Sequence, residues 1–291
     1  MLLLTGATGL IGSALLRRLT AAGTPVRCLV RDPRRLGPER VRVQIALGDL
    51  GDPPSFRNAL RGVDTVVHLA ASIRDQSAGS IEELNGIATW RMVQAAERAG
   101  VQRFVFFSVL GASTHHRGRL FRAKALAEQA VRESPVASTV FAPSIVYSPG
   151  DSWLTLLERL SLLPVMPLSG LGRAVYAPIW ADDVADCVMA DLGRRAGEER
   201  FELVGPDLLS HRQIIRLVLR GAGRRRVIVP VPTPVVSRAL RALEAVARGR
   251  SFATWDEAEL MESSMTSTRG TRDVERLGVV PQHMAAVLGI T

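Results

Sequence analysis

The strongest constraint on the fold is the glycine-rich stretch TGATGLIG at residues 5–12. Gly6, Gly9 and Gly12 follow an apolar run and precede a segment with the apolar spacing of a helix, which stops at Gly23. Glycines at a strand-to-helix turn let bare amides approach a pyrophosphate, which the helix N-terminus also favours. The stretch therefore predicts a dinucleotide-binding turn, and a tight turn with a purely structural role is the alternative.

The following 200 residues alternate short apolar runs with segments of helical period. The strand candidates are residues 1–5, 26–30, 41–47, 64–69, 103–108 and 138–142. Two helices have readable starts: SIEE from Ser80 is a capping box, and Ser210 precedes an apolar-periodic segment. This alternation predicts an α/β fold, with a doubly wound parallel sheet covered by helices on both faces.

The alternating pattern of strands and helices changes after about residue 200, where VIVPVPTPVV is too proline-rich for a central strand. We expect a dinucleotide-binding domain over residues 1–150 plus about 176–200. Residues 151–175 and 201–291 would form a smaller, mainly helical lobe for substrate or partner.

The chain carries a formal net charge of +9, which suits an anionic ligand, nucleic acid or a membrane surface. Its arginines concentrate in GRRR (223–226) and in SRALRALEAVARGR (237–250). No aromatic residues interleave with them as a single-strand platform requires, which argues against nucleic acid. A protein partner or a membrane surface is the expectation for this basic lobe, and a solvated helix face is the alternative.

Cysteine usage and the N-terminus bear on the compartment. Cys28 and Cys187 lie far apart in apolar stretches, as buried thiols do, and no Cys/His spacing suits a metal, so no metal site is expected. MLLLTGATG lacks a basic region and a cleavage signal, and charges and prolines interrupt the apolar stretch from Trp153. We expect a cytoplasmic protein, with a peripheral membrane location left open.

The end of the second strand, VRCLVRDP, bears on the choice of dinucleotide. An acid at its last position would bind the adenosine ribose, but Val30 stands there and Arg31 follows. Arginines near the strand suit a 2′-phosphate. Asp32 lies at the spacing of an NAD-type acid, and we interpret it as a turn cap before Pro33. The sequence thus favours NADP(H) over NAD(H).

Lys124 is the only lysine among 37 basic residues. Because an ammonium is a compact charge whose pKa falls on burial, lysine and arginine do not replace each other at a reactive position. Lys124 is therefore a candidate functional amine, or else a solvated helix residue.

At this point several motifs resemble those of the atypical or extended short-chain dehydrogenase/reductases, which have a Rossmann sheet and epimerase-like relatives. The matching stretches are TGATGLIG, GDLGD, VDTVVHLAA, ELNGIAT, RFVFFSVLGA, Lys124, FAPSIVYSPGD and IWADDVADCV. FELVGPDLLSHRQII and ATWDEAELMESSM further resemble the branch that contains the nucleotide-binding accessory subunit of respiratory complex I.

The resemblance implies a role for individual residues. It places Gly6, Thr8, Gly9, Leu10, Ile11 and Gly12 at the pyrophosphate, Arg31, Asp49 and Leu50 at the adenosine end, Leu69, Ala70 and Ala71 at the middle of the cofactor, and Lys124, Pro143 and Ile145 at the nicotinamide and its ribose.

The family's Tyr-x-x-x-Lys motif is broken, because Leu120 stands four residues before Lys124. The family's serine or threonine falls at Val109, next to Ser108. Without the tyrosine, carbonyl chemistry lacks its usual general acid. Lys124 and Ser108 remain as candidate catalytic residues, and His115 with His116 could supply a substitute acid.

Three functions follow. The first is an NADPH-dependent reductase of an apolar, electrophilic or quinone-like small molecule, and Lys124 or a water would handle the proton. The second is a non-catalytic NADP(H)-binding structural or sensor protein in an assembly. The third is a basic adaptor with an empty cofactor fold.

Overall fold

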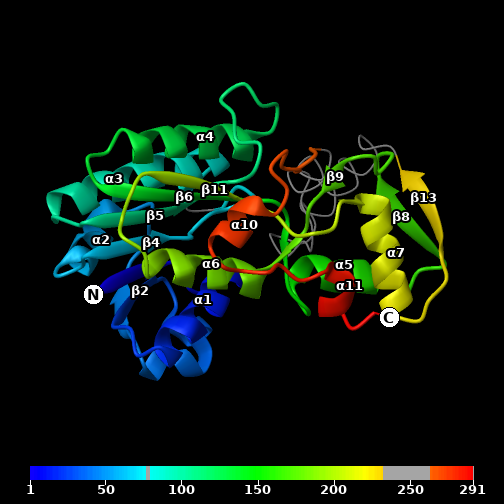
Figure 1. Ribbon diagram of the computed structural model, residues 1–291, viewed down its shortest axis with the longest axis horizontal. Coiled ribbons are helices and arrows are strands. Elements are labelled where there is room, and N and C mark those ends of the chain that lie inside the picture. The colour runs from blue at the N-terminus through cyan, green and yellow to red at the C-terminus, as the bar shows by residue number, and fades with distance from the viewer. Residues whose placement is uncertain (77–78, 232–262, 291) are drawn as a thin grey trace. The chain divides into compact units, whose positions relative to one another are not determined.

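The computed structural model describes residues 1–76, 79–231 and 263–290, which form two compact units (Figure 1). The first unit comprises Met1–Pro143, Ala181–Leu203 and Arg272–Val280, and the second comprises Ser144–Trp180, Val204–Thr271 and Pro281–Thr291.

The first unit contains a seven-stranded sheet in which every pairing is parallel. In spatial order its strands are β3 (Gln44–Leu47), β2 (Val26–Val30), β1 (Leu2–Thr5), β4 (Thr65–His68), β5 (Arg103–Phe107), β6 (Ala137–Pro143) and β11 (Glu199–Leu203). The chain moves outward from β1 to β3 and then returns to start β4 on the other side of β1. The predicted α/β sheet is therefore confirmed, and its switch point lies between β1 and β4.

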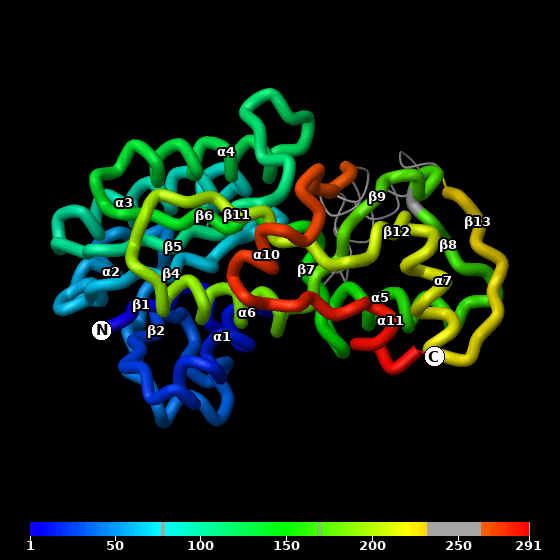
Figure 2. Tube along the Cα trace, in the orientation of Figure 1, coloured from blue at the N-terminus to red at the C-terminus, as the bar shows by residue number. Residues whose placement is uncertain are grey.

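Helices cover both faces of this sheet. They are α1 (Leu10–Ala21), η1 (Pro33–Val41), α2 (Pro53–Arg57), η2 (Asn58–Leu60), η3 (Glu83–Ile87), α3 (Ala88–Arg98), α4 (Arg119–Arg132), α6 (Ala181–Leu192) and α10 (Arg272–Arg276). Figure 2 shows α3 and α4 over one face and α1 with α6 over the other. The capping box at Ser80 is confirmed, because its amide donates to Glu83 Oε2 at 2.8 Å and its Oγ accepts from Glu83 N at 3.2 Å.

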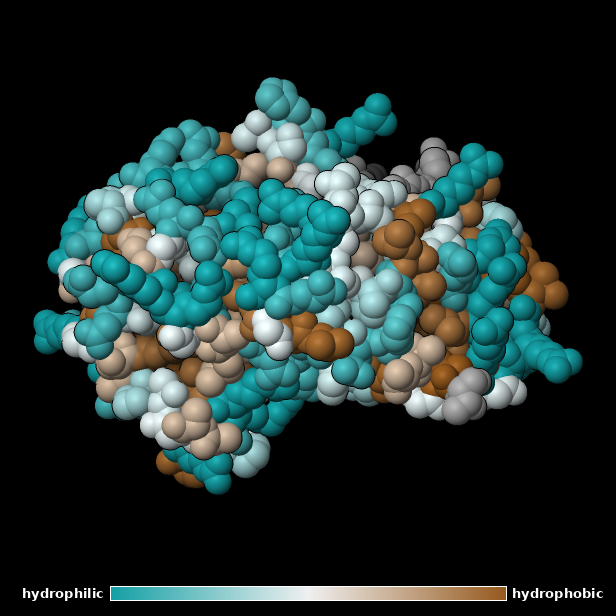
Figure 3. Space-filling model, viewed as in Figure 1, coloured by the Kyte–Doolittle hydropathy of each residue, from teal (hydrophilic) through white to brown (hydrophobic). Residues whose placement is uncertain are grey.

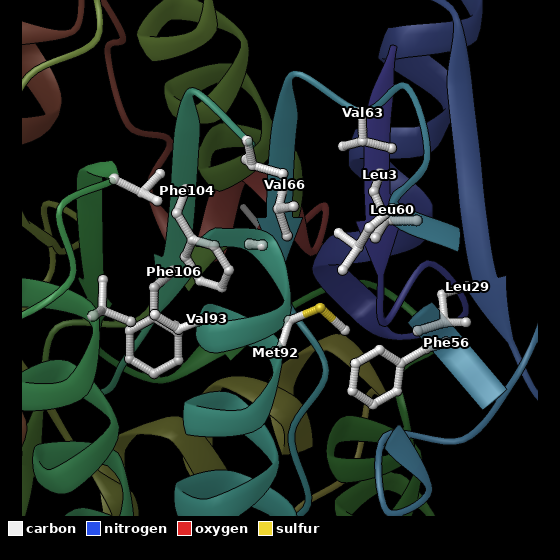
Figure 4. Packing of buried hydrophobic residues seen from close by; sticks show 14 of the residues in the cluster. Leu3, Leu29, Phe56, Leu60, Val63, Val66, Met92, Val93, Phe104 and Phe106 are labelled. Carbon is white, nitrogen blue, oxygen red and sulfur yellow. The ribbon is translucent and has the colours of Figure 1, made fainter. Parts of the chain in front are cut away.

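The central strands consist mostly of apolar residues because both of their faces are buried. All four residues of β1 and all five of β5 are buried. Figure 4 shows the core beneath α3, where Met92 lies between Phe106 of β5 and Phe56 of α2. Arg103, a buried charge at the start of β5, is paired with Asp191 of α6 at 2.7 Å, as a buried charge requires.

The unit boundaries differ in several places from the sequence-based domains. Residues 144–150 and 176–180, expected in the dinucleotide-binding domain, belong to the second unit, and residues 201–203, expected in the lobe, belong to the first. Residues 272–280 were assigned to the second lobe, but the structure returns them to the first unit, where α10 packs on β11. Asp273 of α10 is buried there and accepts from the Glu202 amide at 2.9 Å. A five-residue helix carries too short an apolar pattern to reveal this partner in advance.

The second unit combines helices with two-stranded sheets. Its elements are β7 (Val146–Tyr147), α5 (Ser152–Leu160), β8 (Val165–Ser169), β9 (Val175–Tyr176), β10 (Ile179–Trp180), β12 (Leu209–Ser210), α7 (His211–Gly221), β13 (Val227–Val231) and α11 (Met284–Val287). The capping box that begins α7 at Ser210 confirms the predicted helix start. In the described part of this unit the proline-containing β13 pairs with β8. A two-stranded sheet tolerates proline since each strand has a free edge.

Within the described residues, no helix combines the length and the apolar character needed to cross a membrane.

Candidate functional site

A cavity of about 350 Å³ lies at the carboxyl ends of β1, β2 and β4, beside the switch point of the sheet. Of the residues expected to hold a cofactor, it is lined by Gly6, Thr8, Gly9, Arg31, Asp49, Leu50, Leu69, Ala70 and Ala71. Parallel sheets bind ligands in such a crevice, because consecutive strands leave the switch point in opposite directions.

The glycine turn forms one end of the cavity. Gly6 has φ +72°, and a Cβ there would lie 2.6 Å from the Ala70 amide nitrogen, so only glycine fits between the turn and the end of β4. A Cβ on Gly12 would lie 2.1 Å from Gly6 O, so Gly12 serves the close packing of helix on strand. Among the described residues no side chain caps α1. The amides of its first turn, at Leu10 and Ile11, therefore remain for an anionic acceptor.

Arginines and acids meet at the other end of the cavity. Arg31 is exposed; its Nη1 lies 3.3 Å from Gln76 Oε1 and 3.9 Å from Asp49 Oδ2. Arg35 also lines the cavity. This end can therefore offer two guanidinium groups to a ligand, and Gln76 and, at longer range, Asp49 compete for the first.

Asp32 also lines the cavity, but Arg34 occupies both of its oxygens. Arg34 Nε and its backbone amide donate to Asp32 Oδ1 at 3.0 Å, and Arg34 Nη2 donates to Oδ2 at 3.1 Å. These hydrogen bonds, those from the side chain foremost, hold the pKa of Asp32 below its usual value. The interpretation of Asp32 as a turn cap is confirmed, since it caps η1.

A buried hydrogen-bond chain supports the turn from beneath. Thr89 donates its hydroxyl proton to Asn85 O at 2.7 Å, so at 3.1 Å it must accept from His68 Nε2. His68 Nδ1 then accepts from the Thr5 hydroxyl at 2.8 Å, and Thr5 Oγ1 lies 3.4 Å from the Ala70 amide. Burial first and the nearby Lys124 charge second lower the pKa of His68 to about 3, so its ring is neutral at pH 7. Sequence patterns did not reveal this chain, whose members come from three distant segments.

The wall after β4 is fixed by Asn85. Its Oδ1 accepts from Ser72 N at 3.1 Å, and its Nδ2 donates to Ser72 O at 2.7 Å and to Ile81 O at 2.8 Å. Ser72, Gln76 and Leu84 line the cavity and were not expected from the sequence. No spacing signal marks them, because they belong to an irregular loop and to the helix start behind it.

Lys124 lies inside the first unit, on α4, and is 4% exposed. Its Nζ donates to Phe107 O at 2.7 Å and lies 4.9 Å from the centre of the Phe106 ring. Desolvation lowers the pKa of this amine to about 7, while Glu128 opposes the shift. The lysine is therefore not a solvated helix residue. It lies outside the described lining of the cavity, at the end of β5.

The residues around Lys124 offer few alternative acids. Leu120, one helical turn earlier on α4, is half-buried. Ser108 follows β5, and its hydroxyl is buried without a hydrogen-bond partner among the described residues. His116 Nδ1 accepts from Gly118 N at 2.9 Å and its ring stacks on Phe121, so it supports the start of α4.

The structure does not bring all of the expected residues together. Pro143 ends β6 in the first unit, whereas Ile145 belongs to the second unit, so their expected roles at the nicotinamide stay predictions. Within the described ranges, no group of three or more His, Cys, Asp or Glu side chains could hold a metal ion.

Comparisons with known proteins agree with this geometry. Residues 6–159 match a family model described as NAD(P)H-binding. The chain is 30% identical to a ceramide reductase of Caulobacter vibrioides over 64% of this chain and 59% of that protein. It is 28% identical to the mitochondrial NADH dehydrogenase [ubiquinone] 1 alpha subcomplex subunit 9 of Arabidopsis thaliana, over 79% and 60%. The chain thus spans about three fifths of the length of these two relatives.

A third relative is covered more fully. The chain is 32% identical to the (4-alkanoyl-5-oxo-2,5-dihydrofuran-3-yl)methyl phosphate reductase of Streptomyces griseus, over 77% of this chain and 74% of that protein. Among solved structures, a nucleoside-diphosphate-sugar epimerase of Staphylococcus aureus matches with a TM-score of 0.77 at 18% identity, over 99% of both chains. At this identity the likeness concerns the fold alone.

Proposed function

Because the chain belongs to the NAD(P)H-binding family, among the atypical short-chain dehydrogenase/reductases, we propose that it is an NADPH-dependent reductase that works without the family's tyrosine. The observation that carries this proposal is the cavity beside the glycine turn, in a unit that also buries the amine of Lys124 on a helix where Leu120 stands in place of the family's tyrosine.

The cavity fits a dinucleotide on two grounds. The turn at Gly6 leaves no room for a Cβ, so backbone can approach a ligand there, and the uncapped first turn of α1 offers amides to a pyrophosphate. Leu50 would border the adenine, and Leu69 to Ala71 would border the middle of the cofactor. When bound, NADPH would supply a hydride to the substrate.

The preference for NADPH rests on the adenosine end. Arg31 and Arg35 line the cavity there, and guanidinium groups bind phosphate monoesters in a bidentate manner. Asp32 would repel a 2′-phosphate if it were free, but Arg34 neutralises it and occupies its oxygens. The local field therefore favours the phosphorylated cofactor.

Lys124 is the candidate proton source. An amine with a pKa near 7 is present in both protonation states at neutral pH. It is therefore a stronger acid than a solvent-exposed lysine and can donate a proton to a substrate. Substrates that accept hydride at carbon through a conjugated system need less assistance at oxygen than simple ketones do. A small apolar, quinone-like or enone-like molecule is accordingly the proposed substrate class. The name of the Streptomyces relative supports the conjugated carbonyl, although the compound in that name also carries a phosphate.

A second function has its own support. A non-catalytic protein that binds NADP(H) within an assembly would also lack the tyrosine, and the similarity to a respiratory complex I subunit favours it. The test is whether bound NADPH turns over.

Purified protein would be titrated with NADPH and NADH by fluorescence, and NADPH oxidation would then be followed with a panel of quinones and enones. We expect Arg31→Ala to weaken NADPH binding about tenfold or more, the contribution of a charge-assisted hydrogen bond, and NADH binding far less. Arg40→Ala, an exposed arginine of the same segment outside the cavity lining, is the control. Equal losses for both cofactors would refute the 2′-phosphate assignment, and NADPH that survives washing without any turnover would favour the non-catalytic function.

A further inference from the structure

A groove of about 430 Å³ lies within the second unit, and none of its lining residues lines the cavity beside the glycine turn. Six arginines line it and are called the arginine groove here: Arg212, Arg216, Arg220, Arg224, Arg225 and Arg226. The first three recur every fourth residue along α7 and therefore share one face of that helix. The other three follow the turn after α7 and lead into β13.

The charge of this groove is not neutralised within the protein as far as the structure describes it. No carboxylate of the described residues pairs with any of the six guanidinium groups, and none lines the groove. The whole chain has a formal net charge of +9, so the six positive charges of this groove are a large part of the excess. Like charges held this close repel one another, and they raise the local concentration of anions.

Two of the arginines are fixed by the end of α5. Arg224 Nη1 donates to Ser161 Oγ at 2.6 Å, and Arg226 Nε donates to Ser161 O at 3.1 Å and Leu163 O at 2.9 Å. Arg226 thus binds carbonyls, and Arg224 a hydroxyl, at the C-terminal end of α5, and that end of a helix favours cations. Arg216, Arg220 and Arg225 remain exposed. The groove is therefore anchored on one side and open on the other.

Exposed aliphatic side chains adjoin the arginine groove. Val227 is 69% exposed and pairs in register with Val165, which is 46% exposed. Leu162 and Leu163 are 63% and 45% exposed, next to the carbonyl that binds Arg226. These four residues are called the aliphatic rim. On the right of Figure 3, over the area of α7 and β13 in Figure 1, hydrophilic and hydrophobic residues lie side by side.

We propose that the arginine groove and the aliphatic rim dock the protein onto a membrane surface that carries anionic lipids. Guanidinium groups would bind the phosphates of the headgroups, and the rim would enter the boundary between headgroups and acyl chains. A free phosphorylated ligand would need the arginines but not the exposed valines and leucines. A nucleic-acid platform would need aromatic side chains, and the residues that line the groove include none.

Flotation of the full chain with vesicles tests the proposal. Vesicles of phosphatidylcholine alone would be compared with vesicles that also contain phosphatidylglycerol. The main variant is Arg212→Gln/Arg216→Gln/Arg220→Gln, which keeps a good helix former at each position. Its matched control is Arg42→Gln/Arg57→Gln/Arg61→Gln, which removes the same charge from exposed positions of the first unit.

We expect the wild type to bind only the anionic vesicles. Each arginine near an anionic surface contributes about a factor of five, so the main variant should bind on the order of 100-fold more weakly, while the control stays close to the wild type. Val165→Thr/Val227→Thr keeps β-branched residues in the strands and should weaken vesicle binding about tenfold. This second variant decides the matter if the first does not fold.

Several results would overturn the proposal. The first is equal binding of the wild type to both kinds of vesicle. The second is that the arginine and valine variants bind anionic vesicles as strongly as the wild type does. The third is that the valine variant binds a single-stranded oligonucleotide as strongly as it binds vesicles. NADPH titrations of the same variants keep this test separate from the proposed reductase, because the substitutions lie outside the cofactor cavity.

Discussion

Replacing Lys124 with methionine should remove a steep pH dependence from the stability of the cofactor-free protein. Burial lowers the pKa of Lys124 from its usual 10.5 to about 7. Between these values the unfolded chain binds the proton and the folded chain does not, so wild-type stability rises with pH. The slope is half-developed at pH 7 and approaches 1.4 kcal/mol per pH unit above it, which amounts to about 2 kcal/mol between pH 7 and pH 9. Below pH 7 both states bind the proton and the slope vanishes.

Urea unfolding at a series of pH values measures this difference. The unfolding free energy of the Lys124→Met variant should change with pH less than that of the wild type, by the amount given above, and at pH 6 the variant should be the more stable of the two. Arg132→Met on the same helix is the control, because its side chain is 61% exposed. Parallel pH profiles of wild type and Lys124→Met would show that the amine is solvated in the folded protein and would refute the reasoning.

Three further predictions concern the turn and its support. Gly6→Ala should abolish measurable NADPH binding and lower the melting temperature. Gly23 also has a positive φ but has open space around it, so Gly23→Ala should lower the free energy of unfolding by only about 1 kcal/mol and leave NADPH binding intact. Thr5→Val leaves the Nδ1 of His68 without its donor, so chemical denaturation should show a loss of about 1–3 kcal/mol. Ser108→Ala removes a buried hydroxyl that has no partner among the described residues, so the cofactor-free protein should be as stable as the wild type or more stable in the same assay, and a clear loss of stability would reveal a bond to that hydroxyl.

The sheet could be predicted because its signals are local. Buried parallel strands are apolar throughout, and the turn at Gly6 needs a backbone conformation that other residues rarely adopt. The chain order of strands and helices then leaves few topologies open. The helix cap at Asp32 could be predicted for the same reason, since it depends on residues two positions apart.

Other features depend on contacts between distant segments. The hydrogen-bond chain through His68 joins residues from β1, β4 and α3, so no spacing along the sequence marks it. The burial of Lys124 is likewise a property of the packed helix; composition drew attention to this residue without deciding between a buried and a solvated amine. The sequence shows GRRR at 223–226 as a basic cluster. Only the folded structure shows that these arginines line one groove together with the arginines of α7. The basic stretch at 237–250 lies outside the described residues.

The proposed function requires that the cavity beside the glycine turn hold NADPH with its 2′-phosphate at Arg31. A crystal structure of the protein with NADPH tests it most directly. We predict density for the pyrophosphate at the first turn of α1 and for the 2′-phosphate within hydrogen-bond distance of Arg31 or Arg35. A nucleotide bound elsewhere, or a cavity that stays empty at saturating NADPH, would refute this assignment.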